Sequence, residues 1–304
     1  MKVLDIVQCP RIGHHPHGDV AAGRQRLAGD GRYRWAVNPA DLRSLRDGDL
    51  KSREESLYHL LDRAGSVDDE SAAQALRTLV RDYPDYHRSL YTRAMNQVAV
   101  FGDATIEAPL LAALADTQYN CQAWAATGCT VLGFRAAVPG LLAMLNHPQW
   151  MAREQAVIGL GELGDESVVE ALAPLLRDTT EWMRQRAADA LAKIRGAAAL
   201  AALWEEFEHR RYQRIGYIAS ALALFTPEII PRLCAAAAGD DPDMRYWAAV
   251  ALGSTGDDRA VATLERLLAE DHGVTVFDGQ VSAAAKKGLR TLRRIQSAIA
   301  ARPR

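Results

Sequence analysis

The stretch that decides the fold is "MAREQAVIGLGELGDESVVEALAPLLRD", residues 151–178. Its first half places small residues at helical spacing, and its second half places leucines at i, i+3 and i+4. Both patterns are typical of helices with one apolar face. Between them, Gly164-Asp165 suits a left-handed helix end followed by the N-cap of a second helix. The stretch therefore predicts two helices, joined by a tight turn, whose apolar face needs a neighbour.

The same pattern recurs along the chain about every 31 residues. The seven copies share a small residue at the third or sixth position after their start, and they begin at Tyr91, Gln122, Arg153, Arg184, Arg214, Arg245 and Ser282. About six extra residues precede the last copy. Repeats of this length are typical of stacked helical arrays. We expect an all-α fold, a right-handed α-solenoid of about seven short helix pairs.

Some turns follow the pattern and others depart from it. Gly256-Asp257 repeats the Gly-Asp turn, and Thr226-Pro227 is expected to replace it with Pro at the first helical position. Phe134 and Arg195-Gly196 break the pattern, so we expect reshaped turns there. Pro174 falls within a second helix and should interrupt it, because proline lacks the backbone N–H.

The domain boundaries follow from where the repeat pattern begins and ends. Residues 1–9 and 32–37, outside the repeats, suit short strands. The chain is expected to comprise a non-repeat N-terminal segment at 1–50, a degenerate capping helix pair at 51–87, repeats at 88–278 and a basic C-terminal capping helix at 279–304.

Composition limits the cellular setting. The chain has 36 basic and 38 acidic residues, and no apolar run approaches the roughly 20 residues that span a bilayer. The first residues lack the apolar core and cleavage site of a signal peptide. The four cysteines show no disulfide spacing. We therefore expect reduced thiols, a cytoplasmic location and no membrane partner.

Residues 151–178 and "MRYWAAVALGSTGDDRAVATLERLLAED", residues 244–271, resemble the short HEAT-like repeats of the phycobilin-lyase class. The resemblance covers roughly residues 88–300, and it lies in packing residues, so it implies a fold but carries no catalytic residue across. It implies that the concave face is lined by the second helices, at 104–115, 136–146, 167–177, 197–209, 227–238 and 259–269.

A column of aromatic residues precedes four successive first helices. Its members are about one repeat apart, so they should align along one edge of the array: Tyr119, Trp150, Trp182 and Tyr212. The rings could fold back as hydrophobic staples between units. Alternatively they form an exposed ladder that binds a partner, since Trp and Tyr are enriched at binding hot spots.

A second candidate surface is the concave face. The fourth second helix brings together Trp204, Glu205, Glu208 and His209. Sparsely charged second helices could form a groove for a hydrophobic segment or a small ligand. The alternative is that the same side chains simply belong to the core.

The C-terminal segment is basic. It has no acid from Gln280 onward and carries Lys286, Lys287, Arg290, Arg293, Arg294, Arg302 and Arg304. The cations could complement the dipole of their own helix. Alternatively they form a docking site for an acidic partner or for nucleic acid.

Metal binding is a weaker hypothesis. Cys9, His14, His15 and His17 are suitable ligand types, but no second cluster completes a site. We expect a polar loop there and no cofactor. Deoxyhypusine hydroxylases also use HEAT-like repeats and hold iron with His-Glu pairs, but this chain has no His-Glu dipeptide. The glycines of "GLGELG", residues 159–164, lie inside a predicted helix, which excludes a dinucleotide-binding loop.

The pattern favours a non-enzymatic protein-interaction module, of an adaptor, assembly or immunity type. It would bind a protein or peptide on the concave face or the aromatic edge. A first alternative is a chromophore or ligand lyase/chaperone subunit resembling phycobilin lyases, with contacts from Trp204, Glu205, His209, Tyr212 and Cys234. A second alternative is a nucleic-acid-binding HEAT-like protein, although the acidic array is unfavourable for phosphate.

Overall fold

The structure is a computed structural model that describes residues 24–26, 33–35, 52, 55–56, 107–115, 122–212 and 215–301. The chain divides into two compact units, Met1–Tyr83 and Pro84–Arg304. In the first unit, β1 (Arg24–Arg26) pairs antiparallel with β2 (Tyr33–Trp35). β2 lies within the strand predicted at 32–37. β1 was not predicted because it is wholly polar, and residues 1–9 lie outside the described residues.

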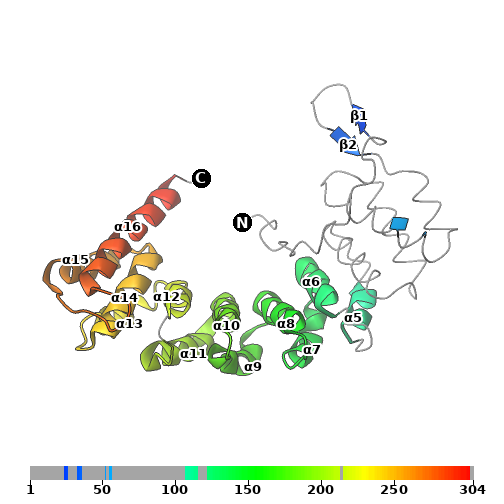
Figure 1. Ribbon diagram of the computed structural model, residues 1–304, viewed down its shortest axis with the longest axis horizontal. Coiled ribbons are helices and arrows are strands. Elements are labelled where there is room, and N and C mark those ends of the chain that lie inside the picture. Colours follow the sequence, from blue (N-terminus) through cyan, green and yellow to red (C-terminus); the bar gives the residue numbers. More distant parts are fainter. Residues whose placement is uncertain are drawn as a thin grey trace. The chain divides into compact units, whose positions relative to one another are not determined.

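The second unit is an all-α solenoid, as predicted (Figure 1). Each repeat contains a first and a second helix. The first helices of successive repeats are α6 (Gln122–Leu132), α8 (Trp150–Leu163), α10 (Glu181–Ile194), α12 (Gly216–Ala223), α14 (Pro242–Thr255) and α16 (Val281–Ala300). The second helices are α5 (Glu107–Ala115), α7 (Val138–Met144), α9 (Val169–Leu172), α11 (Gly196–His209), α13 (Ile230–Ala236) and α15 (Val261–Glu270). Short 3₁₀ turns adjoin three of these second helices. η3 (Arg135–Ala137) precedes α7, η4 (Glu166–Val168) and η5 (Ala173–Arg177) flank α9, and η6 (Asp258–Ala260) precedes α15.

The repeat register fills the core in two rows. An alanine three residues into the copy is fully buried at Ala125, Ala156, Ala187, Ala248 and Ala285, whereas the copy that starts at Arg214 has Tyr217 at this position. A leucine row in the second helices is equally buried, at Leu141, Leu172, Leu203, Leu233 and Leu264. Because each row recurs once per repeat, every unit covers the apolar face of the next, and hydrophobic burial stabilises the array as a whole.

The first helices pack directly against one another, which decides how the array curves. A Cβ at Gly161 would lie 2.8 Å from Cα of Ala190, and one at Gly253 would lie 2.3 Å from Cα of Gly288. In Figure 1 the closely packed first helices α6, α8, α10 and α12 lie along the inner side of the curve. The second helices α7, α9 and α11 lie on its outer side. The expectation that second helices line the concave face is therefore wrong in this view, because small residues draw the other row together.

Several predicted turns are confirmed. Asp165 accepts a hydrogen bond from the backbone N–H of Ser167 at 3.0 Å, and Asp257 accepts one from the N–H of Arg259 at 2.9 Å. Gly256 has the expected left-handed backbone, with φ of 70°. These contacts satisfy backbone groups that helix ends leave unpaired.

Two turn predictions are wrong. Gly164 has an extended backbone, with φ of −76°, and its small size is what matters. A Cβ there would lie 2.5 Å from the carbonyl oxygen of Leu160. Pro227 does not begin a helix, because residues 224–229 form consecutive turns and α13 begins at Ile230, followed by Pro231.

The interrupted and inserted segments lie where the sequence predicted them. Pro174 ends α9 after four residues, and the chain continues as the 3₁₀ turn η5. Arg195, with φ of 64°, both ends α10 and precedes α11, which is the reshaped turn. The insertion before α16 is a hairpin closed by a bridge between Val274 and Gln280. Within the described residues, no helix is long and apolar enough to cross a membrane.

Candidate partner-binding edge

The repeat arginines fix the loops that carry the aromatic column. Arg153, Arg184 and Arg245 occupy the same position in their units, near the start of a first helix. Each donates from Nη1 to the two backbone carbonyls five and six residues before it, at 2.7–3.3 Å. Charge-assisted bonds of this kind are stronger than neutral ones. The loops before α8, α10 and α14 are therefore held in place, and with the first two the starts of the helices that carry Trp150 and Trp182.

Trp150 and Trp182, here called the tryptophan pair, contact each other across neighbouring units. Their ring centroids are 5.4 Å apart with an interplanar angle of 75°, an edge-to-face arrangement. Trp150 begins α8 and is 52% exposed, whereas Trp182 is the second residue of α10 and half-buried. Met151, next to Trp150, is 39% exposed. The pair is thus a rigid apolar surface that remains open to solvent.

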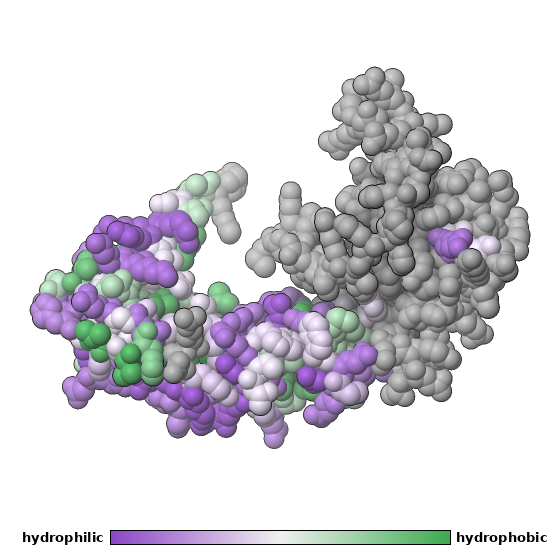
Figure 2. Space-filling model, viewed as in Figure 1, coloured by the Kyte–Doolittle hydropathy of each residue, from purple (hydrophilic) through white to green (hydrophobic). Residues whose placement is uncertain are grey.

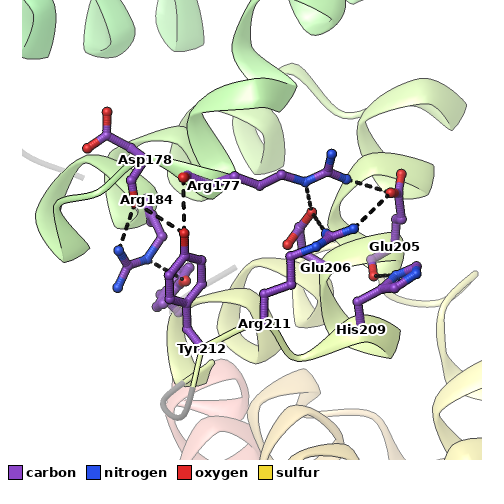
Figure 3. A network of polar contacts seen from close by, with 9 residues as sticks. Arg177, Asp178, Arg184, Glu205, Glu206, His209, Arg211 and Tyr212 are labelled. Carbon is purple, nitrogen blue, oxygen red and sulfur yellow. Dashed lines mark hydrogen bonds and ion pairs between the residues drawn. The ribbon is translucent and has the colours of Figure 1, made fainter.

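Tyr212 behaves differently from the tryptophan pair. The guanidinium carbon of Arg184 lies 3.7 Å from the centre of its ring, and its hydroxyl donates to the carbonyl of Arg177 at 3.0 Å. The two contacts reach earlier repeats, through Arg184 in α10 and Arg177 in η5 (Figure 3), so Tyr212 is a staple between units. Tyr119, the first member of the predicted column, lies outside the described residues.

An ion pair borders the tryptophan pair. Glu154 lies one helical turn after Trp150, and Arg186 one turn after Trp182. Nε of Arg186 is 2.9 Å from Oε1 of Glu154, which links α8 and α10 one helical turn beyond the two tryptophans. An aromatic centre with a polar border is the usual anatomy of a protein interface.

A buried carboxylate lies farther along the array, in α11. The side chain of Glu206 is 5% exposed and accepts hydrogen bonds from Arg177, at 2.5 Å, and from Arg211 (Figure 3). Arg177 also reaches Glu205, at 2.5 Å. The hydrogen bond to Glu206 raises the pKa of Arg177 above its ordinary value. This cluster joins η5 to α11 and is structural, because each buried charge has a partner.

The predicted groove residues of α11 lie in the outer row and separate into two groups. Trp204 is 4% exposed and lies in the core, in contact with Phe207 and beneath the guanidinium of Arg232. Glu205, Glu208 and His209 are exposed. Nδ1 of His209 is 2.8 Å from the backbone carbonyl of Glu205, and Glu208 is 3.7 Å from Arg232. None of the described contacts brings the side chains of Glu205, Glu208 and His209 together into one binding site.

The thiols and metal-ligating residues offer little chemistry. Burial raises the pKa of the Cys129 thiol to about 12, so it is not a nucleophile at neutral pH. Cys234 accepts a hydrogen bond from Thr263 at 3.3 Å. In the described part of the chain, no group of three or more His, Cys, Asp or Glu side chains could hold a metal ion. The predicted candidates Cys9, His14, His15 and His17 lie outside it.

Sequence reasoning missed the charged contacts between units. Glu206 and its partner Arg177 are 29 residues apart, and Glu162 and Lys193, whose charged atoms are 2.5 Å apart, are 31 residues apart. Opposite charges about one repeat apart were the signal that could have revealed them, because such residues face each other in adjacent units.

The sequence pattern of HEAT repeats matches residues 107–192, 138–223 and 212–277, which together span more than half of the chain. No curated protein matches the chain. The predicted HEAT-like repeats are therefore confirmed over this region.

Three solved structures are similar to the chain in fold alone. An engineered protein has a TM-score of 0.50 at 19% identity, over 84% of this chain and 78% of its own. Human deoxyhypusine hydroxylase, in complex with glycerol, has a TM-score of 0.31 at 19% identity, over 84% and 95%. The complex of CpcE and CpcF of phycocyanin lyase from Nostoc sp. PCC7120 has a TM-score of 0.35 at 21% identity, over 94% and 100%.

Proposed function

Because the chain belongs to the HEAT repeat family, we propose that it is a non-enzymatic scaffold that binds a protein partner at the tryptophan pair. The observation that carries this proposal is the exposure of Trp150, a residue that is 52% accessible although the buried side chains of its own helix α8 form part of the core. A large exposed aromatic side chain has an unfavourable interaction with water, which a partner would relieve.

The rigidity of the edge supports the same reading. Trp150 and Trp182 contact each other, and Arg153 and Arg184 hold the two loops that precede their helices. A preformed aromatic surface loses little side-chain entropy when a partner binds. Hot spots at protein interfaces are enriched in tryptophan for this reason and because of its large contact area.

The border of the edge fits a protein partner. The ion pair between Glu154 and Arg186 contains one charge of each sign, and Met151 adds adaptable apolar contact beside Trp150. A surface of mixed charge does not favour a uniformly anionic ligand such as nucleic acid. It suits a protein segment that places an apolar side chain against the rings.

The test is affinity capture from an extract of the cells that naturally make the protein, using the full chain. The double variant Trp150→Ala/Met151→Ala is compared with Leu224→Ala, which removes another exposed apolar side chain from the array. We expect the same captured protein with the wild type and Leu224→Ala, and its loss with the double variant. Equal capture by all three would refute the proposed edge.

A further inference from the structure

The outward face of the last helix is a stripe of positive charge. The five cations of α16, here called the basic stripe, are all exposed: Lys286, Lys287, Arg290, Arg293 and Arg294. The opposite face packs into the array through Val281, Ala284, Ala285, Gly288, Leu289 and Leu292. At 3.6 residues per turn, the cations occupy roughly a third of the helix circumference, directly away from the core. Figure 2 shows hydrophilic residues along α16.

The helix dipole does not explain the basic stripe. Cations complement the dipole within the last turn of a helix. The last turn of α16 has no basic residue, and the stripe lies in its middle turns. A solvated capping face would be expected to mix both signs of charge, but α16 contains no acid.

The basic stripe also lacks partners within the described residues. A single ion pair reaches it there, between Nη2 of Arg293 and Oε1 of Glu265, at 4.0 Å. No carboxylate is within ion-pair distance of Lys286, Lys287, Arg290 or Arg294 in that part of the chain. Like charges on adjacent turns of a helix repel one another, so this arrangement is unfavourable unless an anionic partner neutralises it.

We propose that the basic stripe is a second docking surface, separate from the tryptophan pair, and that it binds an acidic helix of a partner protein. Its length, from Lys286 to Arg294, is about 12 Å, or two helical turns. A partner helix with carboxylates at i, i+4 and i+7 would match the spacing of Lys286, Arg290 and Arg293 and could pair with these three cations.

Two other anionic surfaces fit less well. The first is an anionic membrane surface. A helix that binds there needs a free apolar face, and the apolar face of α16 is already buried against α14 and α15. Nucleic acid would extend well beyond the 12 Å stripe, and the chain has a net charge of −2 despite these five cations. The remainder of the chain is therefore acidic and would repel a long phosphate backbone, whereas a short acidic helix stays within the stripe.

The test uses a fluorescent, Glu-rich helical peptide of about 20 residues and the full-length protein. Binding is followed by anisotropy as salt is raised to about 200 mM. The variant Lys286→Gln/Lys287→Gln/Arg290→Gln is compared with Arg135→Gln/Lys193→Gln/Arg259→Gln, which removes three exposed cations outside both docking surfaces. We expect salt-sensitive binding by the wild type, about tenfold weaker binding by the stripe variant, and little change in the control.

The proposal is overturned if the peptide does not bind, or binds the stripe variant as tightly as the wild type. It is also overturned if the stripe is required instead for binding a single-stranded DNA oligonucleotide or vesicles that contain phosphatidylserine. Trp150→Ala is included because it should leave peptide affinity unchanged, so that failure of either docking surface is distinguishable from failure of the other. Circular dichroism confirms that each variant is folded.

Discussion

Replacing Gly253 with Ala tests the close packing that shapes the array. The added Cβ would lie 2.3 Å from Cα of Gly288, whereas carbon atoms in favourable contact are about 3.5–4.0 Å apart. The two helices would have to separate by more than about 1 Å, because backbone atoms cannot rotate away as a side chain can. Overpacking of this kind costs about 1–3 kcal/mol, and the upper part of that range applies to a backbone clash.

Helix propensity acts in the opposite direction. Ala is favoured over Gly in a helix interior by about 1 kcal/mol. The free energy of unfolding should therefore fall by about 1–2 kcal/mol in Gly253→Ala, as measured by urea unfolding. Hydrogen exchange should increase mainly in α14 and α16, because repeat arrays open locally.

The matched control is Gly239→Ala, whose Cβ would lie 3.4 Å from the carbonyl oxygen of Ala236 in a turn without positive φ. Its unfolding free energy should change by less than about 0.5 kcal/mol. If Gly253→Ala were as stable as the wild type, or more stable, the argument that small residues set the spacing of the first helices would be refuted.

Three further changes test individual contacts. The hydrogen bond from Arg245 lowers the pKa of Asp271, so this pair should stabilise the fold above about pH 4 and lose that contribution as pH falls through the lowered folded-state pKa. Asp271→Asn should therefore destabilise at neutral pH, and a gap from wild type that does not narrow in acid would contradict this. Glu206→Gln should lower the free energy of unfolding in urea by about 2 kcal/mol, because it leaves Arg177 and Arg211 without their buried carboxylate. The control Glu205→Gln, at an exposed carboxylate, should lower it by less than about 1 kcal/mol. Similar losses in the two variants would argue against a stabilising role of the buried Glu206 cluster. Thr275→Val should speed exchange of the two amides that donate to its hydroxyl in the hairpin before α16, and unchanged exchange rates would show that this hydroxyl does not hold the hairpin.

The sequence was sufficient to predict the repeat array. The period placed buried alanines such as Ala156 and Ala187 in register, because packing recurs with the same geometry in every unit. Single-residue effects with a local cause were also predictable, as at Pro174. Curvature was not predictable from the pattern of one unit, because it depends on which row of helices is more closely spaced.

The candidate site was predicted in part. The period correctly aligned Trp150 with Trp182, which are in contact. It did not distinguish them from Tyr212, because that distinction depends on where the Arg184 guanidinium lies. The burial of Trp204 was likewise hidden, since an apolar residue in a second helix has the same pattern whether it faces the core or a groove.

The most direct test of the central claim compares two effects of Trp150→Ala in the full-length protein. About half of the surface of Trp150 is buried, so loss of its side chain should lower the free energy of unfolding by about 1–2 kcal/mol. If the tryptophan pair is the binding edge, affinity for the captured partner should fall by about 2 kcal/mol, or roughly thirtyfold. A loss of more than about 3 kcal/mol in stability, with partner affinity unchanged in the folded protein, would show that Trp150 is a staple and contradict the account.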